Sequence, residues 1–156
     1  MFHLKLLIGA ALLGAVLVPA GGAVASYACQ DGVTSGQWDL PSGSSSFGFL
    51  SGKLADPTGT YGIYAIDAVL VDDPSPCLSC VTGAIYGTVD DGIGPGPDYY
   101  LVGGYSGIFF TGQGTFAAKI VPPGSNTSVG IVEGKFEDPP FPGGIGKFEG
   151  KWEICP

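Results

Sequence analysis

The sequence predicts an all-β fold of about eight antiparallel strands, arranged as an up-and-down barrel or a curled β-sandwich. Residues 146–154 alternate between apolar or glycine residues and Lys or Glu, the period of a strand with one packed and one solvated face. A phrase Gly-x-Φ-x-Gly-x-Φ, with Φ a large apolar residue, begins at Gly48, Gly83, Gly103, Gly130 and Gly146. Turn-rich clusters separate the alternating stretches, and no stretch after residue 25 carries a helical period.

Each expected strand is bounded by residues that interrupt strand pairing. The expected strands cover residues 37–40, 47–54, 60–71, 80–89, 99–110, 112–121, 128–137 and 145–154. Clusters rich in Pro, Gly, Asp and Ser separate most of them, at residues 41–45, 56–59, 72–76, 90–97, 122–126 and 138–144. Proline removes a ladder donor and glycine releases the backbone, so neither continues a strand. The fifth and sixth strands are expected to form a hairpin that turns near Thr111, where the signal is weaker.

The alternating glycines favour a barrel over a sandwich. Glycine weakens a strand interior, so its regular use needs a physical reason. Small and large residues that alternate along an inward face suit a tightly curved barrel, because each large side chain can lie over a neighbouring glycine. In a sandwich, the same glycines would only relieve crowding between two sheets.

Two short fragments resemble known families. Phe148-x-Gly150-x-Trp152 resembles the core of membrane-occupation-and-recognition-nexus repeats, and Gly36-Gln37-Trp38 resembles a fragment of avidin-type barrels. The repeats recur at a fixed step, whereas the five glycine phrases here are 35, 20, 27 and 16 residues apart, which argues against a solenoid. The avidin-like fragment covers three residues and brings no set of biotin-contacting positions. Neither resemblance assigns a family.

The first 25 residues predict export. Residues 1–25 read as a cleaved signal peptide, with a weakly basic start, an apolar run over 6–18 and the small-residue cleavage site Ala23-Val24-Ala25. Residues 26–156 are then expected to form a single β domain that is secreted or held at the cell surface. The apolar run is too short for a comfortable membrane span, so no span is expected after cleavage.

Composition excludes several classes of function for the mature chain. Without residues 1–25 the chain has five Lys, no Arg, no His and 14 acidic residues, which gives a net charge of −9. Such a chain repels nucleic acid and anionic lipid surfaces. Without His and Arg, one mature chain cannot build a Ser-His-Asp or Cys-His site, a histidine metal centre or an arginine phosphate clamp.

The four cysteines predict two structural disulfides. Cys29 and Cys155 lie at opposite ends of the mature chain, and Cys77 and Cys80 form a C-x-x-C pair. The predicted pairing is Cys29 with Cys155 and Cys77 with Cys80. A redox centre usually starts a helix, and a four-cysteine zinc site needs a second close pair, so both alternatives fit this sequence less well.

Three further groups of residues are candidates for chemistry. Asp90, Asp91 and Asp98 bound a Gly-Pro loop and could bind calcium, although an acidic turn without metal is the simpler interpretation. Exposed tyrosines could grip a flat ligand or a sugar, and the candidates are Tyr61, Tyr86, Tyr99 and Tyr100. Glycoside hydrolysis would need paired carboxylates, for which the candidates are Glu133, Glu137, Glu149 and Glu153. These glutamates alternate with lysines, so cross-strand ion pairing on a solvated face is expected for them.

Together these features predict an exported binding or structural surface protein without enzymatic chemistry and without a required cofactor. Its expected partners are further copies of itself, or an extracellular glycan or protein. The first alternative is a barrel that binds a small ligand or carbohydrate. The second is a carboxylate-dependent extracellular enzyme, for which Asp67 is the acid to test first because it interrupts an apolar strand. Asn126-Thr127-Ser128 is also a glycosylation acceptor sequence.

Overall fold

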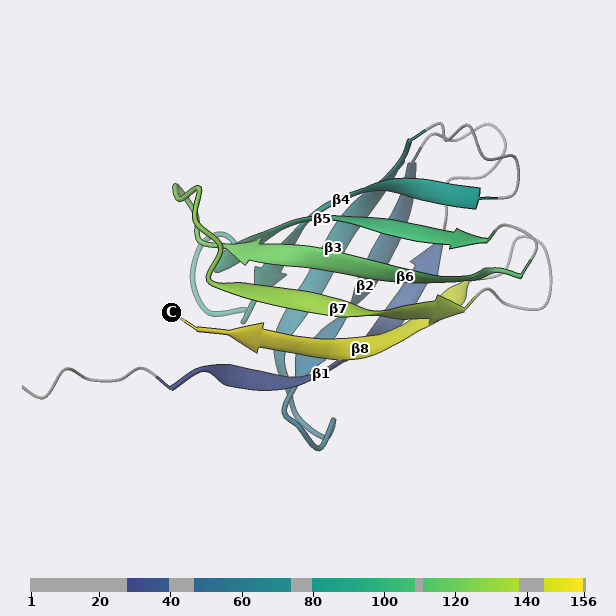
Figure 1. Cartoon of the computed structure of the whole chain (residues 1–156). Helices are drawn as coiled ribbons and strands as arrows, with labels where there is room; N and C mark the ends of the chain where they lie inside the picture. Colours follow the sequence, from purple (N-terminus) through teal and green to yellow (C-terminus); the bar gives the residue numbers. More distant parts are fainter. Residues whose placement is uncertain (1–27, 40–46, 74–79, 109–110, 138–144, 156) are drawn as a thin grey trace, which may run out of the picture.

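The protein is an eight-stranded, closed, antiparallel β-barrel (Figure 1). The computed structural model describes residues 28–39, 47–73, 80–108, 111–137 and 145–155. The strands are β1 (Gln30–Asp39), β2 (Phe47–Ala55), β3 (Gly62–Asp72), β4 (Cys80–Asp90), β5 (Tyr99–Ile108), β6 (Gln113–Val121), β7 (Gly130–Glu137) and β8 (Gly146–Ile154). Each strand pairs with its neighbour in the chain, and β1 pairs with β8 to close the barrel. The predicted up-and-down barrel is therefore confirmed.

The strand boundaries match the predicted ones closely, with one exception. β1 begins at Gln30 rather than at residue 37, because Gln30–Gly36 pairs with β8 even though its own sequence is polar. The predicted signal peptide lies outside the described residues. Within the described part of the chain, no helix is present that is long and apolar enough to cross a membrane.

The strands are staggered by a fixed amount around the barrel. Following directly paired residues from Trp38 through Leu50 and each later strand in turn, the path returns to β1 at Gln30, eight residues before it began. Eight strands with this stagger give an interior just wide enough for side chains to fill. The geometry of closure therefore predicts a packed barrel.

Aromatic rings lie over glycines inside the barrel, as the alternation predicted. A Cβ atom added at Gly36 or Gly52 would meet the ring of Phe148, and one added at Gly134 would meet the ring of Phe116. The same relation holds between Gly32 and Trp152, Gly83 and Tyr105, Gly114 and Phe136, and Gly146 and Trp38. Each ring occupies the space that a side chain on the neighbouring strand would otherwise fill, so the glycines are part of the core.

Two tryptophans anchor opposite ends of the interior through their indole N–H groups. Trp152 donates to the carbonyl of Ala55 at 2.8 Å, where a register irregularity between Leu54 and Ala55 interrupts the β2–β3 ladder. Trp38 donates to the carbonyls of Glu137 and Lys147 at 3.1 and 3.0 Å. Both indoles are 2 % exposed. Because the donors are satisfied, these large side chains can be buried without the cost of an unpaired polar group.

The β2–β3 loop is organised by the Asp56 carboxylate. Its oxygens accept hydrogen bonds from the Thr58 hydroxyl at 2.8 Å and from the amides of Thr60 and Tyr61 at 3.0 and 3.1 Å. Gly59 completes the turn with a φ of 73°, which favours glycine. These hydrogen bonds hold the pKa of Asp56 below its ordinary value of 3.8, and the bond from the Thr58 hydroxyl has the largest effect.

Candidate functional site

The barrel interior is filled with side chains. An internal void of about 10 Å³ lies among the core residues Trp38, Leu50, Leu70, Ile85, Tyr105, Phe116 and Phe136. A void of that size holds about one water molecule, whereas ligand pockets usually measure roughly 300–1,000 Å³. This void is therefore too small for an organic ligand.

Tyr105 places an unpartnered hydroxyl in this core. Its side chain is 5 % exposed, and among the described residues the hydroxyl makes no hydrogen bond. Burial, together with the nearby Asp72 carboxylate, raises the pKa of Tyr105 to about 12. The hydroxyl lies against Gly83, so a bulkier residue on β4 would collide with it.

The outer wall formed by β7 and β8 carries a ladder of opposite charges. Residues that pair directly are Glu137 with Lys147, Lys135 with Glu149, and Glu133 with Lys151. The Lys151 Nζ atom lies 3.1 Å from the Glu133 carboxylate in an exposed ion pair. Exposed pairs of this kind contribute only about 0–1 kcal/mol each to stability. The arrangement is the cross-strand pairing expected of a solvated face.

A broad, shallow depression of about 990 Å³ lies over the middle of β5, β6, β7, β8 and β1. Its lining combines the central part of the charge ladder with the small residues Ser35, Ser106, Thr115 and Ala117. Glu133 and Glu149 both line it, and each has a lysine directly opposite on the neighbouring strand. Because charged and hydroxyl-bearing side chains line the depression, it is suited to contact polar groups of a binding partner.

The opposite part of the outer wall carries an apolar row. Phe49, Val69, Tyr86 and Val102 pair directly in sequence across β2, β3, β4 and β5, with their side chains pointing outward. Their exposed fractions are 38, 46, 54 and 46 %. We call these four residues the apolar belt. Contiguous exposed apolar patches of this kind usually mark an interaction surface on a soluble protein.

The four predicted ligand-binding tyrosines lie in different places. Tyr86 belongs to the belt, and Tyr100 is its diagonal neighbour on the same face of β4 and β5. Tyr61 is exposed in the β2–β3 loop. Tyr99 instead points inward and packs edge-to-face on Tyr64 at 6.0 Å, and Tyr64 in turn packs on Trp152. Only Tyr86 and Tyr100 therefore share one surface.

The three predicted calcium ligands do come together. Carboxylate oxygens of Asp90, Asp91 and Asp98 lie within 4.8 Å of one another. Each carboxylate also accepts a hydrogen bond from a backbone amide of the loop at 2.7 Å. Glycines 92, 94 and 96 all have positive φ, which lets the loop fold over these acids. The loop is thus held by its own backbone amides.

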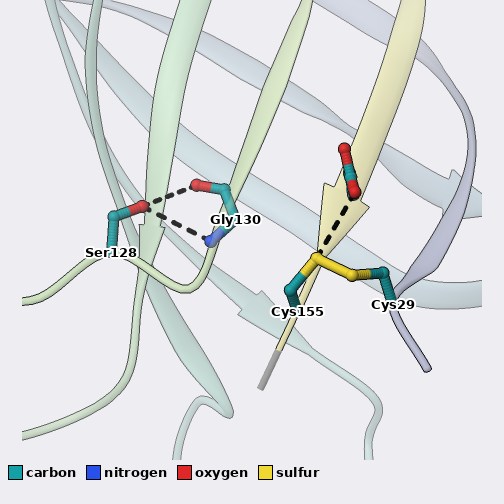
Figure 2. The surroundings of a disulfide bond; sticks show 5 residues. Cys29, Ser128, Gly130 and Cys155 are labelled. Atoms are coloured by element: carbon teal, nitrogen blue, oxygen red, sulfur yellow. Dashed lines mark hydrogen bonds between the residues drawn. A yellow bond between two sulfur atoms is a disulfide. The ribbon is translucent and has the colours of Figure 1, made fainter. Parts of the chain in front are cut away.

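The predicted Cys29–Cys155 disulfide is confirmed. It joins the residue before β1 to the residue after β8, with Cα atoms 4.2 Å apart (Figure 2). Glu153 Oε1 lies 3.3 Å from the Cys155 sulfur, but a disulfide sulfur has no hydrogen to donate, so this is a contact only. Cys80 is also disulfide-bonded. Its predicted partner, Cys77, lies outside the described residues.

The adjacent β6–β7 loop fastens this end of the barrel. The Ser128 hydroxyl donates to the Gly130 carbonyl at 2.7 Å and accepts from the Gly130 amide at 3.4 Å (Figure 2). The Cys155 amide donates to the Val129 carbonyl at 2.7 Å. The disulfide therefore lies on a section of chain that is also held by backbone bonds.

No protein-family model, curated protein or solved structure matches this chain.

Sequence reasoning found Tyr86 but missed the rest of the belt. Phe49, Val69 and Val102 each look like an ordinary strand residue when the strands are considered one at a time. Only the register shows that they are direct neighbours. The available signal was that residues 63–71 are apolar on both faces except at Asp67, which a strand with one solvated face does not need.

Proposed function

We propose that this chain is an exported, non-enzymatic β-barrel that acts through its outer wall, as a binding protein or as a structural component of a surface. The observation that carries the proposal is the contrast between a filled interior and an exposed apolar belt. A ligand carrier needs space between its strands. A protein that binds partners needs apolar area on its surface.

The charge pattern supports a binding role over catalysis. Glu133, Glu137 and Glu149 each face a lysine across the β7–β8 ladder. Glycoside hydrolysis needs two carboxylates that face each other across a groove, one of them kept protonated. Asp67, the other acid of interest, is exposed on β3 and accepts a hydrogen bond from the Ser51 hydroxyl at 2.9 Å. These acids act as surface groups in our proposal.

The proposed setting is extracellular or cell-surface. A disulfide that joins the ends of the barrel suits an oxidising compartment, and the N-terminal sequence has the features of a signal peptide. The acidic surface favours protein or glycan partners over nucleic acid. No cofactor is part of the proposal.

A second candidate function is glycan binding on the outer wall. Tyr86 and Tyr100 are diagonal neighbours there and are 54 and 45 % exposed. Exposed aromatic rings can stack on sugar rings, and the polar edge of tyrosine can hydrogen-bond to them. This candidate uses the same wall of the barrel with a different partner.

Native mass spectrometry followed by denaturing mass spectrometry, on the protein exported by its own host, tests the proposal. We expect a mature chain beginning at Ser26, lowered by four hydrogens for two disulfides, with no small molecule that is released on denaturation. A stoichiometric small molecule lost on denaturation would overturn the proposal in favour of a ligand-binding barrel. Turnover of an extracellular polysaccharide that depends on Glu133 or Glu149 would overturn it in favour of an enzyme.

A further inference from the structure

The apolar belt occupies one half of a register row whose other half is charged. Beyond Val102 on β5, the same row of directly paired residues continues through Lys119 on β6, Ile131 on β7 and Glu153 on β8. The row is thus uncharged over β2–β5 and carries both signs of charge over β6–β8. Two walls of one barrel therefore have different solvation, and the uncharged wall is the one suited to lose its water on binding.

A row of smaller side chains runs beside the belt on β3, β4 and β5, and on β2 the same row begins with the large side chain of Phe47, which is 62 % exposed. Val71, Ala84 and Gly104 pair directly across β3, β4 and β5, two residues along each strand from the belt residues. We call these three residues the low row. Large side chains of the belt, above all Tyr86, stand next to it. Over these three strands a taller row beside a lower one is self-complementary, because a two-fold axis between the rows places the taller row of each copy over the lower row of the other.

We propose that the apolar belt binds a second copy of this chain, with the belt of each copy packed on the low row of the other. This inference rests on the proposed function and specifies its partner.

The exposed area matches what a dimer interface needs. An aromatic side chain can bury about 150–250 Å², so the partly exposed belt together with Tyr100 presents on the order of 400 Å² of apolar surface. A standard interface buries about 800 Å² per partner, of which somewhat more than half is apolar. The belt and Tyr100 therefore supply the apolar core of one such interface, and the row beyond them supplies its polar rim.

Charge also favours a second copy over other partners. The mature chain has a net charge of −9, yet the belt and the low row contain no charged residue. The two rows offer no acid to a basic partner, whereas two identical uncharged walls bring no like charges into direct contact. Tyr86 has the only side-chain polar atom in these two rows, and a sugar would need more polar groups to orient it. Two acids border the belt in the predicted rim: Asp67, one row away on β3, and Asp39, which pairs with Phe49 from β1.

Sedimentation velocity over a concentration series, on the exported chain with its disulfides intact, tests the proposal. We expect a reversible dimer. Val69→Glu puts a charge at the centre of the belt and should give a monomer at every concentration. Tyr86→Ala removes the largest exposed ring and should weaken the dimer about 30-fold or more, the effect of losing an interface hot spot.

Ile131→Glu is the matched control. Ile131 lies in the same register row, points outward and is 41 % exposed, close to the 46 % of Val69, but it belongs to the charged wall. We expect Ile131→Glu to dimerise like the wild type. Circular dichroism melts of all variants check the fold, and if Val69→Glu fails to fold, Tyr86→Ala decides the outcome.

Three results would overturn the inference. They are a wild type that stays monomeric at the highest concentration, a dimer unaffected by Val69→Glu and Tyr86→Ala, and a dimer weakened as much by Ile131→Glu. A monomer that binds insoluble cellulose or chitin through Tyr86 would overturn self-association and leave outer-wall binding intact. A monomer that instead carries a small molecule in native mass spectrometry would overturn both.

Discussion

Gly36→Ala tests whether the interior glycines are required by packing. Gly36 on β1 pairs directly with Gly52 on β2, and the ring of Phe148 covers both. An added Cβ atom would meet the Ser51 carbonyl oxygen, the Gly52 Cα atom and the Phe148 ring. Two of these three obstacles are backbone atoms of a paired strand, which cannot move without breaking the ladder. We therefore expect overpacking rather than local adjustment.

The expected cost follows from the overpacking. Inserting one methyl group into a packed core costs about 1–3 kcal/mol. In a domain of this size, 1 kcal/mol corresponds to about 4 °C in the melting temperature, so Gly36→Ala should lower it by about 4–12 °C. The measurement is thermal unfolding followed by far-ultraviolet circular dichroism.

Gly62→Ala is the control for this experiment. A Cβ atom at Gly62 would meet only the flexible Lys53 side chain, at 3.5 and 3.9 Å. This substitution should be neutral, or stabilising by up to about 1 kcal/mol, because alanine restricts the unfolded chain. If Gly36→Ala melts at the same temperature as Gly62→Ala, the space around Gly36 is not tightly packed and glycine is not required there.

A double variant separates the clash with the Phe148 ring from the clash with the backbone of β2. Phe148→Ala removes the ring above Gly36 but leaves the Ser51 carbonyl in place. We expect Gly36→Ala and Phe148→Ala together to cost less than the two separately, with a coupling of about 0.5–3 kcal/mol. Full additivity would contradict a shared site beneath the ring.

Four further predictions concern single features of the barrel. Replacing Cys29 and Cys155 with serine should lower the free energy of unfolding in urea by about 4–5 kcal/mol, the loop-entropy value for a closure this long; an unchanged midpoint would contradict it. The pKa of Asp56 is lowered on folding, so its carboxylate stabilises the fold above pH 3.8, and this stabilisation is lost as the pH falls through the lower pKa of the folded state. Asp56→Asn should therefore make the free energy of unfolding, measured in urea at a series of pH values, fall less steeply below pH 3.8. Tyr105 should titrate near pH 12 in ultraviolet difference spectra, with stability falling between pH 10 and pH 12, and Tyr105→Phe should remove that fall without destabilising the protein at pH 7. EDTA should leave the melting temperature unchanged, because backbone amides already donate to the carboxylates of Asp90, Asp91 and Asp98. A rise in the melting temperature on adding calcium would refute this.

The sequence predicted the fold well because the fold depends on short-range periodicity. Alternation identified every strand, and the Pro and Gly clusters identified most of the breaks between them. The small-and-large pattern also identified the barrel and the rings over glycines. The early start of β1 was missed because residues 30–36 are strand by virtue of their pairing with β8, not by their own composition.

The candidate surface was harder to predict because it depends on register. Phe49 and Val102 are 53 residues apart in the sequence, and their place in one row is fixed by three successive strand pairings. A shift of one residue in any pairing would have turned part of the row inward. The position of Tyr99 inside the barrel, beside Tyr64, follows from the same register and separates it from Tyr100 next to it.

The disulfide between the ends of the barrel makes the chain a covalent ring from Cys29 to Cys155. One proteolytic cut in any loop between these residues opens the ring but releases no fragment, because the disulfide still joins the two pieces. Two cuts are needed to free a strand, or one cut together with reduction. A nicked molecule would therefore run as one band without reductant and as two with it. The same closure makes each exposed loop a natural place for new termini, since the old ends are already joined.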